Sequence, residues 1–384
     1  MTSWLPLVML SGAAVSWPAA ERVRFADANL KAAVEQALGK MDPTPADMLE
    51  LKRLSAARKG ITNLEGLEYA RNLRYLDLPR NRLGAEITDI SAISELRNLE
   101  ALELMANHIT DISALSQLEQ LRMLDLICNR IEDISSLSEL TNLDVLMLAG
   151  NKISDLSVLS YLRSLTVLAL QDNQVTDIRP LSRLRLEYLD LSSNQISDIS
   201  PLFRMKTLKS LFLNQNQIKD ISALSGLTEL YNLKLAGNQV ADVSALSTMR
   251  KITRMELNDN QISDIAPLAS STTLAAVYLN NNKISNIPDL SALTVLEILH
   301  LHNNRIGDIS GLAGLDMLHE LRLEGNRLNR RAYSTYLPLI EKSNPRLRRP
   351  SSRWRSLLLF SACLAEQGTS REHDKIMDGR CYWG

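Results

Sequence analysis

The sequence predicts an α/β fold: a right-handed, horseshoe-shaped solenoid with a parallel β-sheet on its concave face and short 3-10 helices on its convex face. Two observations support this prediction. A leucine-rich unit of 22 residues recurs through most of the 384-residue chain, and a fixed period of about 20–50 residues is typical of solenoids. Within each unit, apolar and variable positions first alternate, which predicts a strand with one buried face.

Each repeat is marked by an asparagine that follows an L-x-x-L-x-L run. Of the eleven spacings between successive asparagines, nine are 22 residues, one is 26 and one is 21. The whole unit reads L-x-x-L-x-L-x-x-N-x-I-x-D-I-S-x-L-x-x-L-x-x, which is a leucine-rich repeat. The asparagines are Asn81, Asn107, Asn129, Asn151, Asn173, Asn194, Asn216, Asn238, Asn260, Asn282, Asn304 and Asn326.

We expect this asparagine to turn the chain inward. Its side-chain amide can both donate to and accept from the backbone of adjacent turns, so the stacked asparagines predict a hydrogen-bonded ladder inside the solenoid. The Asp-Ile-Ser segment that follows, as in Asp133–Ser135, carries two residues that hydrogen-bond nearby backbone groups. It should therefore start a short, tight helix that ends at two leucines, such as Leu137 and Leu140.

A single turn is not stable alone, so the fold needs many stacked turns and a cap at each end. Seven aliphatic side chains per turn contribute about 10–20 kcal/mol, whereas fixing the backbone of one turn costs on the order of 20–40 kcal/mol. We assign about 13 turns to residues 51–328, where the first turn is degenerate. Because the ends of such an array must be covered, we assign residues 21–50 to a helical N-terminal cap, whose first helix is capped by Asp27, and 329–348 to a C-terminal cap.

Two irregularities interrupt the period. Gly84–Ile87 is a four-residue insertion that we expect to bulge at the edge where the chain leaves the sheet. One residue is missing between Leu184 and Leu186, which should tighten the turn that leads back into the sheet.

The two ends of the chain differ from the repeats. Residues 1–20 predict a secretory signal peptide, because Trp4–Val15 is mostly apolar and Ala14–Ser16 offers a small-x-small cleavage site. The alternative is a frayed N-terminus, since Met1–Ser3 carries no Lys or Arg. We interpret residues 349–384 as a disordered tail, and we do not expect its basic and apolar stretch Arg353–Phe360 to contact a membrane.

The composition argues against several functions. The formal net charge of -1 does not suit a body that neutralises phosphates, so we expect no nucleic-acid partner. No nucleotide-binding, metalloprotease, redox or nucleophile-elbow motif occurs, so we predict neither an enzyme nor a cofactor. His300 and His302 lie two apart on one strand beside Glu324, but no further ligands are available and we predict no metal site.

The side chains between the leucines of each strand should face solvent on the concave side and bind a protein or a glycan. An apolar patch on neighbouring strands is rarely left exposed without a partner, and exposed aromatic residues are typical binding anchors. We expect the small residues Ala169, Ser210 and Ala276 to be exposed with the others. The predicted partner-binding residues are Tyr75, Glu103, Met123, Asp125, Met147, Tyr188, Asp190, Phe212, Arg254, Tyr278 and His300.

The repeat and its flanks resemble one known family. The 22-residue pattern with its D-I-S segment is similar to the internalin-type bacterial leucine-rich repeats, as are the flanks Phe25–Leu30, Gly60–Ala70 and Gly325–Asn329. The resemblance covers about residues 22 to 345, and it implies a binder that is secreted or lies in the cell envelope. The alternative is a cytoplasmic scaffold or phosphatase-type regulatory protein, because such leucine-rich proteins share the 22-residue period. They rank second because they lack this N-terminal flank.

Overall fold

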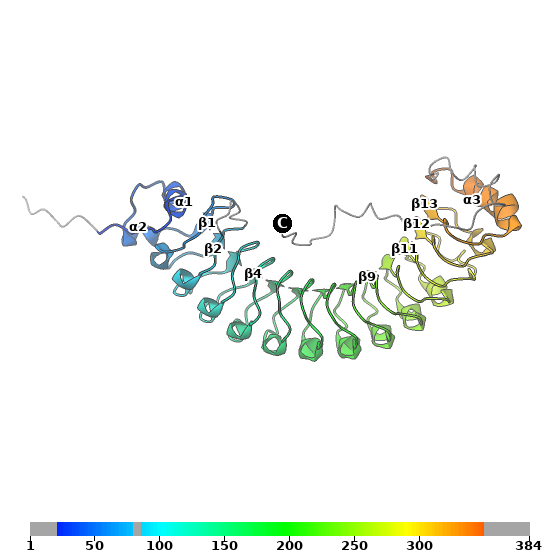
Figure 1. Cartoon of the computed structure of the whole chain (residues 1–384), viewed down its shortest axis with the longest axis horizontal. Coiled ribbons are helices and arrows are strands. Elements are labelled where there is room, and N and C mark those ends of the chain that lie inside the picture. Colours follow the sequence, from blue (N-terminus) through cyan, green and yellow to red (C-terminus); the bar gives the residue numbers. More distant parts are fainter. Residues whose placement is uncertain (1–20, 80–85, 349–384) are drawn as a thin grey trace, which may run out of the picture.

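The computed structural model describes residues 21–79 and 86–348, which form an open arc (Figure 1). In these ranges thirteen strands join in one sheet in chain order, and every neighbouring pair is parallel. The sheet lines the inner side of the arc and short 3-10 helices line the outer side (Figure 1). The predicted α/β solenoid is therefore confirmed. The predicted signal peptide (1–20), the tail (349–384) with Arg353–Phe360, and Asn81 lie outside the described residues.

The strands are three residues long and alternate with the convex helices. The strands are β1 (Arg53–Ser55), β2 (Tyr75–Asp77), β3 (Ala101–Glu103), β4 (Met123–Asp125), β5 (Val145–Met147), β6 (Val167–Ala169), β7 (Tyr188–Asp190), β8 (Ser210–Phe212), β9 (Asn232–Lys234), β10 (Arg254–Glu256), β11 (Ala276–Tyr278), β12 (Ile298–His300) and β13 (Glu320–Arg322). The convex helices are η1 (Leu67–Tyr69), η2 (Ser91–Ile93), η3 (Ser113–Leu115), η4 (Ser135–Leu137), η5 (Ser157–Tyr161), η6 (Arg179–Arg183), η7 (Ser200–Arg204), η8 (Ser222–Gly226), η9 (Ser244–Thr248), η10 (Ala266–Ser270) and η11 (Ser310–Leu312).

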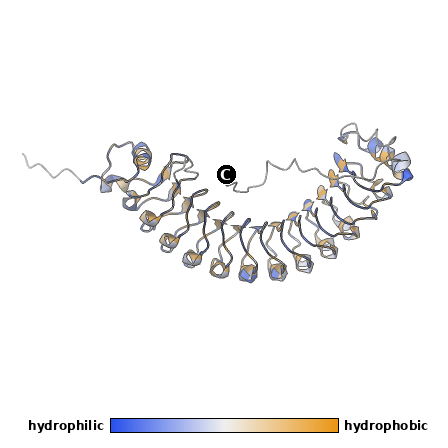
Figure 2. Ribbon diagram, viewed as in Figure 1, coloured by the Kyte–Doolittle hydropathy of each residue, from blue (hydrophilic) through white to orange (hydrophobic). Residues whose placement is uncertain are grey.

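The strand register explains how the irregular repeats are tolerated. Val167 of β6 lies opposite Tyr188 of β7, and Tyr75 of β2 lies opposite Ala101 of β3. These pairs keep the same strand positions together although one repeat is a residue short and another is four residues long. The strands thus keep their register on both sides of each irregularity, although Gly84 and Ala85 of the insertion lie outside the described residues. The hydrophobic segments recur from turn to turn and form one continuous core (Figure 2).

The asparagines form a buried ladder between the sheet and the convex side. In Asn216, Nδ2 donates to the carbonyl of Leu191 in the preceding repeat at 2.9 Å, and Oδ1 accepts from the backbone N–H of Ile196 at 3.0 Å. The same amide also donates to Leu213 within its own repeat, at 3.2 Å. Equivalent bonds recur from Asn107 to Asn326. Each side chain thus connects two turns through backbone groups that water cannot reach.

The residue before the ladder asparagine turns the chain. The repeat pattern alone predicts this role for the asparagine itself. At this position φ is positive in successive repeats, for example 58° at Ala106, 54° at Gln215 and 69° at Gly237. A left-handed conformation costs a residue with a Cβ about 1–2 kcal/mol, whereas glycine adopts it freely. The repeats therefore contain a site of backbone strain that glycine occupies in only some turns.

Replacing Ala106 with glycine should stabilise the solenoid by about 0.5–1 kcal/mol, because relief of the left-handed strain exceeds the larger entropy that glycine loses on folding. The reciprocal variant Gly237→Ala should destabilise it, since φ is 69° there although an added Cβ would lie 3.4 Å from its nearest neighbour. Urea denaturation of both variants measures the two effects. Destabilisation by A106G would contradict the assignment of strain to this position.

The aspartate of each D-I-S segment lies one position before the N-cap of the convex helix, and its carboxylate accepts a backbone hydrogen bond at the start of that helix. In the fourth turn Oδ1 of Asp133 accepts from the N–H of Ser135 at 2.8 Å, while Ile134 occupies the N-cap. The turn between β11 and β12 departs from this pattern, because Asn286 is followed two residues later by Pro288, which has no N–H to donate. No helix forms between β11 and β12.

Separate elements cover the two ends of the described array. At the N-terminal end α1 (Ala28–Leu38) is capped by Asp27, and α2 (Pro45–Met48) begins with a capping box between Thr44 and Asp47. At the C-terminal end a π-helical turn, η12 (Ala332–Tyr336), leads into α3 (Leu337–Ser343). Both ends of the arc in Figure 1 therefore carry helices that the repeats themselves do not contain.

Candidate binding surface

The concave face is formed by the side chains that flank the central buried residue of each strand. All eleven predicted partner-binding residues lie there and are half-buried. The expectation of exposure is wrong for the three small residues: Ala169, Ser210 and Ala276 are 1%, 4% and 8% exposed. Their side chains are too short to rise above their larger neighbours.

The half of this face between β2 and β8 is acidic and apolar. At the strand positions that flank the buried centre it carries the carboxylates of Asp77, Glu103, Asp125 and Asp190, and no Lys or Arg. Between the last two carboxylates lies an apolar patch, which we define by its residues. The apolar patch consists of Met123, Val145, Met147 and Val167, all half-buried.

Neither of the two carboxylates that border the apolar patch forms an ion pair within the described residues. Asp125 accepts a hydrogen bond from the backbone N–H of Ile127 at 2.9 Å, and burial raises the pKa of its carboxyl. Asp190 accepts from the N–H of Ser192 at 2.9 Å, and burial raises the pKa of this group too, although the charge of Lys234, which is paired with Glu256, partly opposes the rise. Partly desolvated and uncompensated charges reduce the stability of a fold, and they gather at functional sites.

The other half of the face, from β8 to β13, is held together by its own contacts, which reach back to Tyr188 of β7. The rings of Tyr188 and Phe212 meet edge to face with centroids 5.3 Å apart. The ammonium of Lys234 lies 5.1 Å from the ring centroid of Phe212 and 3.3 Å from a carboxylate oxygen of Glu256. The two aromatic residues predicted to be exposed therefore cover each other. Burial, together with the charge of Asp190, raises the pKa of Tyr188 to about 12.

The chain of contacts continues to the C-terminal strands. Arg254 bonds Glu256 at 2.9 Å and its guanidinium carbon lies 4.6 Å from the ring centroid of Tyr278. The ring of Tyr278 in turn meets that of His300, with centroids 4.8 Å apart. His300 bonds Glu320 at 3.0 Å. The charges in this half are thus matched within the protein, in contrast to those of the acidic half.

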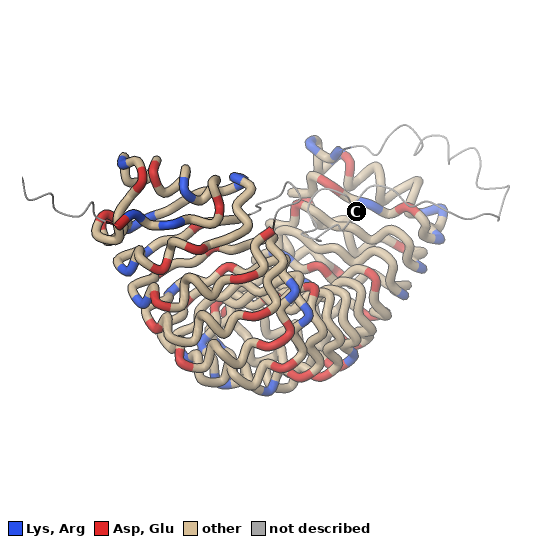
Figure 3. Tube along the Cα trace, turned by 60° about the vertical axis from the view of Figure 1, so that its left-hand side comes forward, with Lys and Arg blue, Asp and Glu red and all other residues tan. Residues whose placement is uncertain are grey.

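Neither histidine of the predicted His300–His302 pair lies in a group that could hold a metal. Within residues 21–79 and 86–348, no cluster of three or more His, Cys, Asp or Glu has suitable geometry. Charged residues of both signs recur along the whole arc (Figure 3). No helix in the described ranges has the length and apolarity needed to span a membrane.

Comparisons with known proteins place the chain in a family. The family model described as "Leucine Rich repeats (2 copies)" matches overlapping segments, namely residues 97–139, 119–161, 141–183, 163–204, 184–224 and 206–248. No curated protein matches the chain in a sequence search.

Solved structures share the fold. A leucine-rich-repeat protein of Leptospira interrogans is 20% identical, with a TM-score of 0.61 over 79% of this chain and 96% of its own. A complex of TLR13 with a single-stranded RNA is 24% identical, with a TM-score of 0.58 over 77% of this chain and 46% of its own. These two likenesses concern the fold alone.

A closer likeness extends to the sequence. The internalin InlF of Listeria monocytogenes is 33% identical, with a TM-score of 0.67 over 84% of this chain and 88% of its own. This identity and coverage extend the likeness from the fold to the sequence over most of both chains. The chain therefore belongs to the internalin family of leucine-rich-repeat proteins.

Proposed function

We propose that the chain is an exported, non-enzymatic binding module whose concave face takes a protein partner. The observation that carries this proposal is the apolar patch bordered by Asp125 and Asp190, two half-buried carboxylates that form no ion pair within the described residues. Such an arrangement costs stability in the free protein and gains energy when a partner supplies the missing charge. Membership of the internalin family supports the proposal.

The patch defines the chemistry of the partner. Asp125 lies on β4 and Asp190 on β7, so three strand spacings of about 4.8 Å separate them by about 14 Å. The partner should present apolar side chains between two cationic groups at about that separation. We favour a protein over a glycan because methionine and valine side chains offer a sugar neither hydrogen bonds nor an aromatic face.

The two carboxylates should have opposite effects on binding and on stability. Asp125→Asn and Asp190→Asn should each weaken partner binding by about 1–3 kcal/mol, and the loss should shrink at high salt. Both variants should melt at a higher temperature than the wild type at pH 7. Because the pKa of each carboxyl is raised in the folded state, its ionised form destabilises the fold, and the asparagine removes that cost. The gain in stability should vanish as the pH falls through the raised folded pKa towards the unfolded pKa near 3.9, since the carboxyl is then protonated in both states.

The measurement requires a partner, which a pull-down with the full chain as bait would provide. Glu119→Gln is the matched control, since Glu119 is exposed on the loop after η3. Unchanged affinity in both concave variants would rule out the acidic half as the binding surface.

The aromatic pair tests the same face with uncharged side chains. Tyr188→Ala and Phe212→Ala should each cost about 1–3 kcal/mol of binding energy. Their matched controls are Tyr161→Ala and Phe203→Ala on the convex helices, where the side chains are 64% and 52% exposed. Ser136 is not a suitable convex control, because its hydroxyl donates to the carbonyl of Ile112 at 3.1 Å. Loss of binding in the convex pair alone would contradict the proposal.

Export is tested separately, by N-terminal sequencing of the mature protein. Removal of about twenty residues is the result expected for an exported protein. An intact Met1 would favour the alternative, an intracellular scaffold or phosphatase-type regulator.

A further inference from the structure

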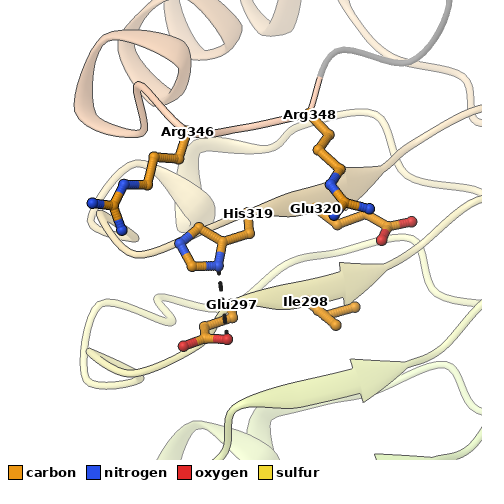
Figure 4. Close-up of a pocket in the computed structure, with 6 residues that line it drawn as sticks. All are labelled: Glu297, Ile298, His319, Glu320, Arg346 and Arg348. Atoms are coloured by element: carbon orange, nitrogen blue, oxygen red, sulfur yellow. Dashed lines mark ion pairs between the residues drawn. The ribbon is translucent and has the colours of Figure 1, made fainter.

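A pocket of about 370 Å³ lies at the C-terminal end of the sheet, where the chain passes back over the last two strands after α3 (Figure 4). This volume suits a single side chain or a small molecule. Ile298 contributes apolar surface, and the other lining residues are charged or titratable. They are Glu297, His319, Glu320, Arg346 and Arg348.

The segment that carries the two arginines is anchored on both sides. Before it, the buried side chain of Asn344 donates to the carbonyl of Leu315 at 2.7 Å and accepts from the N–H of Leu318 at 2.6 Å. After it, the N–H of Arg348 donates to the carbonyl of His319 at 2.9 Å. The backbone of the segment is thus tied to the last repeat, and both arginines line the pocket (Figure 4).

Within the described residues, the acidic residues of the pocket have partners, whereas the arginines do not. Glu297 forms an ion pair with His319 at 3.7 Å. Glu320 bonds His300 at 3.0 Å and Arg322 at 2.8 Å. Neither Arg346 nor Arg348 makes an ion pair or a side-chain hydrogen bond with any residue of the described ranges. No described carboxylate therefore neutralises these two guanidinium groups, which is the arrangement that an anion could use.

We propose that this pocket binds a carboxylate, namely the acidic side chain of a polypeptide. A guanidinium pairs in bidentate fashion with either a carboxylate or a phosphate. The carboxylates of Glu297 and Glu320 favour the first, because they repel a dianionic phosphate more strongly than a monoanionic carboxylate. The methylene groups of a glutamate can lie against Ile298. This pocket binds an anion, whereas the acidic half of the concave face binds a cation. The proposal for the pocket therefore does not depend on the function proposed for the acidic half.

The probe is the capped peptide acetyl-Gly-Glu-Gly-amide, titrated into the full-length protein with labelled isoleucine methyl groups. The δ1-methyl resonance of Ile298 should shift and saturate with a dissociation constant in about the millimolar range. Arg346→Gln and Arg348→Gln should each weaken binding about tenfold. Arg330→Gln, at an exposed arginine that does not line the pocket, should bind like the wild type.

Three further results decide the proposal. The analogue acetyl-Gly-Gln-Gly-amide should leave the Ile298 methyl resonance unchanged, and an equal shift with this neutral peptide would overturn the role of the carboxylate. Tighter binding of inorganic phosphate than of the glutamate peptide would overturn the choice of anion. An effect of R330Q as large as that of the pocket variants would reduce the site to general surface charge.

Discussion

Deletion of residues 22–50 should cause the protein to aggregate. These residues form α1 and α2, and they bury Leu30, Val34 and Met48 against the first turns. Without them β1 becomes an uncovered edge strand, with unpaired backbone groups beside exposed leucines. Size-exclusion chromatography and far-ultraviolet circular dichroism measure the result. A truncated chain that stays monomeric and unfolds cooperatively would contradict the assignment of a cap.

A single substitution tests the same cap without removing it. The carboxylate of Asp27 accepts from the N–H groups of Asn29 and Leu30 in α1, at 2.8 and 3.0 Å, and from the N–H of Thr62 in the first turn at 2.7 Å. Burial alone would raise the pKa of Asp27, but these hydrogen bonds hold it below its usual value. Its contribution should therefore be present above the unfolded pKa of about 3.9 and be lost as the pH falls towards the folded pKa.

Asp27→Ala should destabilise the protein by about 2 kcal/mol at pH 7, since it removes a helix cap and the connection to Thr62. Near pH 2 the variant and the wild type should differ little. Asp220→Ala, which removes a single bond to the N–H of Ser222 on the convex side, is the milder comparison. Equal melting temperatures for D27A and wild type at pH 7 would exclude this connection as a determinant of stability.

Replacing Asn216 with alanine should lower the free energy of unfolding by about 3 kcal/mol. The substitution leaves the carbonyl of Leu191 and the N–H of Ile196 without their side-chain partner in the interior, and each unsatisfied buried group costs about 1–3 kcal/mol. Gln217→Ala is the control, because Gln217 is exposed in the same repeat and should change stability by less than about 0.5 kcal/mol. A urea midpoint for N216A within error of the wild type would show that the ladder bonds do not stabilise the fold.

Much of the architecture could be predicted from the sequence because it is encoded in short-range patterns. The 22-residue period predicts the parallel register, since stacking identical units places Leu146 opposite Leu168. The interaction of Asp133 with Ser135 is equally local, because the two residues lie two positions apart. Repetition also predicts the ladder. The same asparagine recurs in every turn, so its side-chain amide meets the same backbone groups each time.

The candidate site was only partly predictable. The alternation of residues located the concave face, but it could not show that Ser210 is covered or that Tyr188 and Phe212 shield each other. Those outcomes depend on side-chain sizes in adjacent turns, about 22 residues away in sequence. The left-handed residue before each asparagine was missed because several residue types occupy it, and glycine marks it in only some repeats.

By itself the sequence determined the solenoid, its period, the ladder positions and the identity of the concave strands, because each follows from a repeated local pattern. Only the tertiary structure decided which charges are matched. Asp125 is left without a cation, whereas Glu256 meets both Lys234 and Arg254. The C-terminal pocket likewise brings Ile298 together with Arg346 and Arg348, which follow it by about fifty residues in the sequence. The physical reason is that charge pairing falls off over a few ångströms, so it depends on which side chains the stacked turns bring within reach.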